Sequence, residues 1–142
     1  MEFAYDGGGM GKGGRAKFHY NTLGIKQFDI EATKPIPTGK TQLRMEFAYD
    51  GGGMGKGGTV TLYCDGKEVG KGRVEQTQGI IFSADETTDI GYESGTTVTA
   101  DYTPRTSRFT GKISWVQIDL GSDDNDHFID PEERLRVAMA RQ

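Results

Sequence analysis

Residues 59–74 read TVTLYCDGKEVGKGRV, and this stretch decides the predicted fold. Asp65-Gly66 is a strong hairpin signal, because a tight two-residue turn needs backbone conformations that Asp and Gly tolerate. Val, Thr, Leu and Tyr precede the turn, and such β-branched and aromatic side chains favour strands. The stretch therefore predicts two antiparallel strands, residues 59–64 and 67–74.

Three further strands are predicted upstream of this hairpin. RAKFHY (15–20) and KQFDIE (26–31) alternate apolar with polar residues, and NTLG between them reads as a turn. In TQLRMEFAYD (41–50), apolar side chains recur at every second position, which places them on one face of a strand.

Downstream of the hairpin, GIIFS (79–83), TTVTADY (96–102) and FTGKISWVQIDL (109–120) also read as strands, the last of them as a core strand. An acidic loop, 84–95, interrupts this series. DPEERLRVAMARQ follows at residues 130–142, where Asp130 can cap a helix over about 131–141 and Pro131 suits its first position. The chain is thus predicted to be all-β, an antiparallel two-sheet sandwich of about nine or ten strands with a short C-terminal helix.

The sequence MEFAYDGGGMGKGG occurs twice without a difference, at residues 1–14 and 45–58. One pair of segments makes no solenoid, so we interpret it as a duplicated coding segment added to a domain of residues 15–142. Gly53–Gly58 has the spacing of a dinucleotide-binding loop, but that loop must lead from a strand into a helix. Because a strand is predicted next, we expect the glycines to connect two strands.

Composition excludes several function classes. The net charge of −4 argues against nucleic-acid binding, which needs a clustered basic face. No apolar run approaches the roughly 18 residues of a membrane span, and residues 1–14 lack the apolar region of a signal peptide. Cys64 is the single cysteine, so we expect no disulfide within the chain and a small apolar side chain in a strand.

MEFAYDGGGMGKGGTVTLYCDGKEVGKGRVEQTQGIIFSADETTDIG, then FTGKISWVQIDL and PEERLRVAMARQ, resemble the C-terminal region of bacterial arylsulfatases. The plan is more distantly similar to laminin-G-like and concanavalin-A-like jelly rolls, which implies a jelly-roll sandwich. In such sulfatases the catalytic core lies upstream and carries a Cys/Ser-x-Pro-x-Arg motif. Cys64 is followed by neither that proline nor that arginine. The resemblance further implies that the first copy, 1–14, replaces an edge strand and pairs with RAKFHY.

Two groups of candidate site residues follow. Asp85, Asp89 and Glu93 could bind Ca²⁺ through their carboxylates; the alternative is a solvated turn in which Asp85 and Asp89 cap backbone amides. The rings of three aromatic residues could stack on sugars, or could simply be core. These are Trp115, Tyr92 and Tyr102.

The resulting functional hypothesis is a non-catalytic accessory or assembly domain that forms a homo-oligomer, binds carbohydrate and requires no cofactor, with Ca²⁺ as the candidate metal. The alternative is a small free-standing hydrolase acting on glycosides, esters or sulfate esters. The sequence assigns no cellular compartment beyond the bacterial resemblance.

Overall fold

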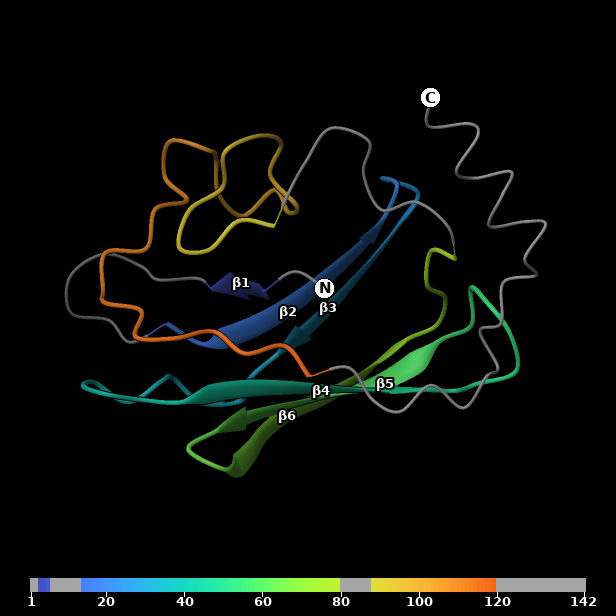
Figure 1. The fold of residues 1–142 in the computed structure, drawn as a ribbon, viewed down its shortest axis with the longest axis horizontal. Helices are drawn as coiled ribbons and strands as arrows, with labels where there is room; N and C mark the ends of the chain where they lie inside the picture. Colours follow the sequence, from blue (N-terminus) through green and yellow to red (C-terminus); the bar gives the residue numbers. More distant parts are fainter. Residues whose placement is uncertain (1–2, 6–13, 80–87, 120–142) are drawn as a thin grey trace.

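The computed structural model describes residues 3–5, 14–79 and 88–119. These residues form two antiparallel three-stranded sheets, each with its strands in sequence order (Figure 1). Sheet A contains β1 (Phe3–Tyr5), β2 (Ala16–Thr22) and β3 (Lys26–Glu31). Sheet B contains β4 (Leu43–Tyr49), β5 (Gly58–Cys64) and β6 (Lys67–Val74). Within the described residues, the prediction of an all-β fold with two antiparallel sheets is confirmed.

The Asp65-Gly66 hairpin forms as predicted. Cys64 and Lys67 pair across it, and both turn residues have positive φ, 49° and 77°. The turn is also tied to the start of β4, because the Gln42 amide donates to Asp65 Oδ1 at 2.9 Å and the Asp65 amide donates to the Gln42 carbonyl at 2.9 Å. One turn therefore aligns all three strands of sheet B.

The core lies between the two sheets. Five side chains are fully enclosed there: Phe18, Ile30, Val60, Leu62 and Val74. Partly buried apolar residues surround them, from β2, β3, β4 and β6. Burial of these side chains is the main favourable contribution to folding.

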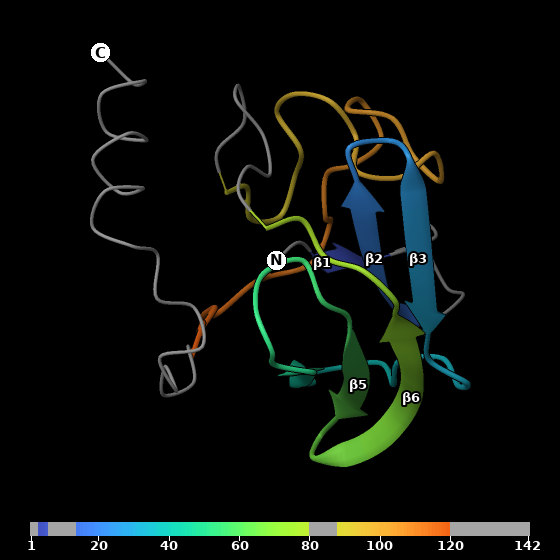
Figure 2. The same ribbon diagram turned by 90° about the vertical axis from the view of Figure 1, so that its right-hand side faces the viewer.

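Two glycines allow the sheets to meet. Gly70 and Gly72 pair with the buried residues Leu62 and Val60, so they share the inward face of sheet B. A Cβ on Gly72 would lie 2.5 Å from Ile30 Cγ1, inside van der Waals contact. Just beyond β3, the Thr33 amide donates to the Val69 carbonyl at 2.8 Å. Figure 2 shows β3 and β6 meeting at this corner.

The first copy of the repeat contributes the edge strand β1. It pairs antiparallel with β2, with Phe3 opposite Phe18 and Tyr5 opposite Ala16. The expected pairing with RAKFHY is therefore confirmed.

The strands predicted over 96–102 and 109–120 are wrong for the residues that the structure describes. Residues 88–119 contain turns, bends and extended chain but no strand. The described part thus has six strands, fewer than predicted. The physical reason is that alternation favours a strand only where a neighbouring strand supplies hydrogen bonds and side-chain contacts. Most of the predicted strand 79–83 and the helix over 131–141 lie outside the described residues.

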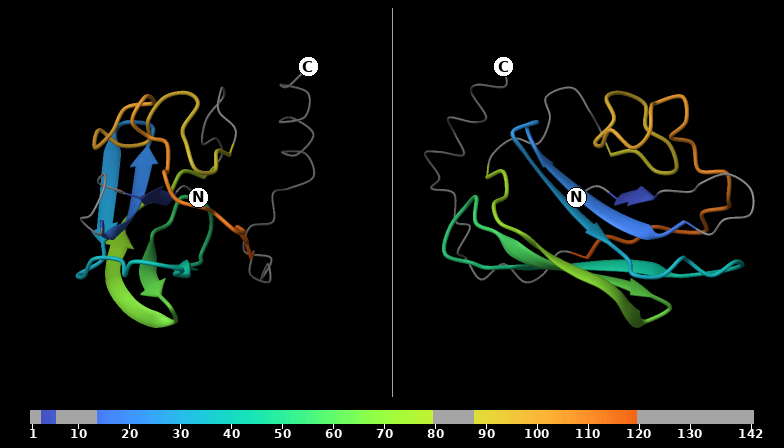
Figure 3. Two further views of the ribbon diagram at one scale, coloured as in Figure 1. Left: turned by 90° about the vertical axis from the view of Figure 1, so that its left-hand side faces the viewer. Right: turned by 180° about the vertical axis from the view of Figure 1, so that it is seen from behind.

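Residues 88–107 lie over the outer face of sheet A, on the side away from the core (Figure 3). The Asn21 side-chain amide donates to the Val98 carbonyl at 3.2 Å, and Lys17 Nζ donates to Asp101. In the described part of the chain, no helix has the length and apolar character needed to cross a membrane.

Candidate functional site

The glycine run connects β4 to β5. Gly51, Gly52, Gly53 and Gly55 have positive φ, between 73° and 107°. The Tyr49 hydroxyl closes the loop, since it donates to the Gly53 carbonyl and accepts from the Lys56 amide at 2.9 Å. A strand follows the loop, so it lacks the helix that a dinucleotide-binding loop requires.

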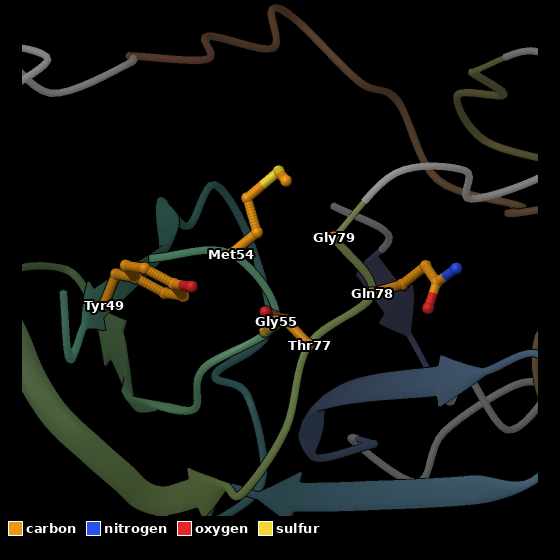
Figure 4. Close-up of a pocket in the computed structure, with 6 residues that line it drawn as sticks. All are labelled: Tyr49, Met54, Gly55, Thr77, Gln78 and Gly79. Carbon is orange, nitrogen blue, oxygen red and sulfur yellow. The ribbon is translucent and has the colours of Figure 1, made fainter. Parts of the chain in front are cut away.

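A shallow hollow of about 170 Å³ lies beside this loop (Figure 4). It is lined by Tyr49, Met54, Gly55, Thr77, Gln78 and Gly79. The Thr77 amide and hydroxyl both donate to the Lys56 carbonyl, at 3.1 and 2.7 Å, and so attach this wall to the loop. Sites for small molecules usually measure about 300–1,000 Å³, so this hollow is small for one.

A charged cluster lies on the outer face of sheet A. His19 is 2% exposed, and its Nδ1 lies 2.6 Å from Asp29 Oδ1. Lys17 Nζ lies 3.2 Å from the same oxygen and also contacts Asp101. Burial acts to raise the pKa of Asp29, but the hydrogen bonds from His19 and Lys17 outweigh it and lower that pKa.

The same contacts also shift the pKa values of Lys17 and Asp101, the other two members of this cluster. Burial acts to lower the pKa of Lys17, but its hydrogen bonds to Asp101 and Asp29 outweigh burial and raise it. The hydrogen bond from Lys17 lowers the pKa of Asp101. Lys17 is therefore a cation held between two carboxylates.

A histidine oriented by an aspartate is typical of nucleophilic catalysis, where the other ring nitrogen faces a hydroxyl or thiol. Here His19 Nε2 is buried and has no hydrogen-bond partner among the described residues. Burial, and then the neighbouring Asp65 charge, raise the pKa of the Cys64 thiol, which disfavours the reactive thiolate. The arrangement thus lacks a nucleophile in the part of the chain that the structure describes.

The pair of His19 and Asp29 was not among the residues predicted from the sequence. The signal was present, because the NTLG turn sets the register of the β2–β3 hairpin and brings these two residues directly opposite each other.

The structure describes two of the three candidate Ca²⁺ ligands. Asp89 Oδ2 accepts from the Ser94 amide at 2.7 Å and the Ser94 hydroxyl at 2.8 Å, and these bonds lower the pKa of Asp89. Glu93 Oε1 accepts from the Val98 amide at 2.8 Å. Both carboxylates therefore stabilise their own loop. Asp85 lies outside the described residues, and no group of three acidic, histidine or cysteine side chains suited to a metal occurs within them.

The three candidate aromatic residues differ in exposure. Trp115 is 60% exposed and Tyr92 is 47% exposed, whereas Tyr102 is half-buried. The Arg108 guanidinium lies 5.3 Å from the centroid of the Tyr92 ring. The interpretation of Trp115 and Tyr92 as core residues is therefore wrong.

Trp115 belongs to an exposed stretch, residues 112–119, that we name the apolar segment. Its four large apolar side chains are 43–67% exposed, namely Ile113, Trp115, Val116 and Ile118. Monomeric soluble proteins rarely expose large contiguous apolar patches, and those that occur mark interaction sites, ligand grooves or aggregation-prone surface. The alternation of this segment is the same as that of a buried strand and predicts a core position, which its exposure shows to be wrong.

Comparison of the chain with protein-family models, with curated proteins and with solved structures finds no match. The resemblance to arylsulfatase tails therefore stays a prediction, and the site rests on its own geometry.

Proposed function

We propose that this chain is a non-catalytic accessory domain that acts by assembly, of the kind found at the C-terminus of arylsulfatases. In this proposal the two sheets belong to a jelly-roll sandwich of the concanavalin-A or laminin-G type. The observation that carries the proposal is the exposed apolar segment, residues 112–119.

Exposure of these apolar side chains to water is unfavourable in free energy. Fully burying one Val, Leu, Ile or Phe side chain is worth about 1.5–3 kcal/mol, and this segment holds Ile113, Val116 and Ile118 in addition to Trp115. A protein surface that covers the segment would gain much of that free energy. The exposed Trp115 indole also offers a surface for a sugar ring, so glycan binding belongs to the same proposal.

Catalysis finds less support in the described residues. The buried His19 imidazole has no nucleophile at Nε2, and the Cys64 thiol has a raised pKa. The hydrolase alternative therefore depends on residues such as Asp85 that the structure does not describe.

One set of measurements tests the proposal. The purified chain is assayed against aryl sulfate, ester and glycoside substrates, with and without Ca²⁺ or Zn²⁺, while light scattering follows its mass against concentration. We expect no turnover and a mass above that of the monomer. Turnover that survives Cys64→Ala and is lost in Asp85→Ala or Asp89→Ala would establish the hydrolase instead.

A glycan array tests the carbohydrate part separately. Binding that is lost in Trp115→Ala and retained in Tyr92→Ala would support the exposed indole as the sugar contact. An array without hits would leave the assembly role alone.

A further inference from the structure

Among the described residues, strand β4 has an open edge. It is the outermost strand of sheet B, paired on one side with β5. The Asp50 amide bonds the Gly57 carbonyl at 3.0 Å, and the Asp65 amide bonds the Gln42 carbonyl at 2.9 Å. In an antiparallel ladder the bonded positions alternate, so even-numbered residues of β4 bond β5. The backbone groups of Met45 and Phe47 therefore point away from β5, toward the open edge.

The inward side chains at this edge are incompletely covered. Met45 and Phe47 are only partly buried, whereas their partners on β5, Leu62 and Val60, are 1% and 0% exposed. The core of sheet B thus ends at β4 with apolar surface still facing water. A further strand at this edge would bury it.

The apolar segment has the properties of such a strand. From Ile113 to Ile118, the backbone of the segment has no hydrogen bond with the backbone of any other described residue. Its apolar residues alternate in part, with Val116 and Ile118 on one side of an extended chain and Ile113 and Trp115 on the other. Its length of residues 112–119 is close to that of β4, residues 43–49.

We propose that the apolar segment of one copy adds to the edge of β4 in a second copy, as an antiparallel fourth strand of sheet B. This inference rests on the proposed assembly function and names its surface. Addition of an extended strand to an open sheet edge is an established mode of recognition, in which backbone bonds give affinity and side chains give specificity.

Charge selects the direction. Lys112 begins the segment and Asp119 ends it, while Arg44 stands near the start of β4 and Asp50 follows its end. Antiparallel addition puts Asp119 opposite Arg44 at one end, and at the other end Lys112 falls opposite Gly51, one position from Asp50. Parallel addition would put like charges side by side, which is destabilising.

The side chains select the register. With Val116 opposite Phe47, Ile118 falls opposite Met45, and both pairs cover the inward face. The outward face then pairs Asp119 with Arg44 and Gln117 with Glu46. The third outward pair sets the Trp115 ring against the small side chain of Ala48.

Two proline variants test the added strand by light scattering. In this register the Val116 amide donates to β4, whereas the Gln117 amide faces the new outer edge, where proline is tolerated. We expect Val116→Pro to lose the dimer and Gln117→Pro to keep it. Equal behaviour of the two variants, with folding verified by circular dichroism, would overturn the proposal.

A disulfide test fixes the partner and the register. In a Cys64→Ala background, chains carrying Glu46→Cys are mixed with differently tagged chains carrying Gln117→Cys, under oxidised glutathione. We expect a crosslink between the two tagged chains. The matched control is Glu2→Cys, which has the same neighbours in sequence in the first copy, and we expect it to give little crosslink.

Each remaining outcome is decisive. A crosslink that forms within one chain carrying both Glu46→Cys and Gln117→Cys, and not between chains, would overturn addition to a second copy. A dimer that persists without crosslinking would overturn this surface while leaving the assembly function intact. A monomer at all concentrations would instead refute the assembly function.

Discussion

The same residues occupy two places in this molecule, and their surroundings differ. The sequence FAY occurs at Phe3–Tyr5 and again at residues 47–49, and both copies lie in an edge strand. In the first copy Ala4 is opposite Lys17 on β2, and in the second Ala48 is opposite Thr59 on β5. Local sequence therefore determines that this segment is extended, whereas the neighbouring strand determines which sheet it joins.

The two strands also differ in length. β1 pairs over three described residues and β4 over seven. Leu43 and Arg44, upstream of the repeat, supply two of the four extra residues, and the counterparts of the other two, Met1 and Glu2, lie outside the described residues. The second copy further contributes Met45 and Phe47 to the packing around the core. The comparison suggests that the second copy carries more of the stability.

The largest effect on stability is expected from Phe47→Ala, compared with Phe3→Ala at the matching position of the first copy. Truncating a core phenylalanine costs about 3–5 kcal/mol, and we expect roughly 2–3 kcal/mol at Phe47 because it is only partly buried. Phe3→Ala should cost less, since β1 joins one strand over three residues. Urea unfolding measures both, and equal losses would mean that the two copies are equally important.

Sheet B depends on its contact with sheet A, and Gly72→Val tests this contact. The new side chain would collide with Ile30 on β3, and overpacking of this kind costs about 1–3 kcal/mol. Lys71→Val is the matched control, because Lys71 is exposed on the opposite face. Thermal unfolding that showed the control to be as damaging would place the close approach elsewhere.

A smaller effect is expected for Tyr49→Phe, which removes the hydroxyl that closes the glycine loop. Loss of such a hydrogen bond costs about 0.5–1.5 kcal/mol. Amide hydrogen exchange at Lys56 should increase at the same time. Tyr5→Phe is the counterpart in the first copy, and an equal stability loss there would show that both copies close the same loop.

The smallest effect concerns pH and the cluster beside the first copy, since Lys17 is in register with Ala4. The pKa values of Asp29 and Asp101 are lowered, so their contribution to stability is complete above the ordinary value of 3.8 and is lost as pH falls through the lowered values. We expect Lys17→Met to flatten the fall in stability over this acidic range. An unchanged pH profile in urea unfolding would contradict this role.

The same linkage acts in the opposite sense at high pH. The pKa of Lys17 is raised, so its contribution is complete below 10.5 and is lost as pH rises through the higher value. Lys17→Met should therefore also flatten the profile in strong base.

Much of sheets A and B was predictable because their hairpins are local. NTLG and Asp65-Gly66 join strands that are adjacent in sequence, and such turns set the register directly. The same reasoning overpredicted strands after residue 88. A strand there has to find an edge far away in sequence, and alternation alone does not say which edge is open.

The candidate site was predicted less well for a related reason. Trp115 and Ile118 carry the pattern of core residues, and only the structure shows that no described strand covers them. Asp89 was correctly considered as a turn residue, since its carboxylate holds Ser94. His19 and Asp29 went unnoticed because neither belongs to a known spacing, although the hairpin brings them together.

The close approach at Gly70 and Gly72 affects how many neighbours one molecule can bind through its sheet edges. Because the close approach joins β3 to β6, it occupies one edge of each sheet. The strands β1 and β4 remain as the two outer edges, which we call margins. Both of these margins contain the sequence FAY, so the repeated segment provides two such margins in one molecule. A contact that two molecules make reciprocally closes a pair, whereas molecules that engage both margins can grow into a chain. The number of working margins, rather than the affinity of either, then determines the size of the assembly.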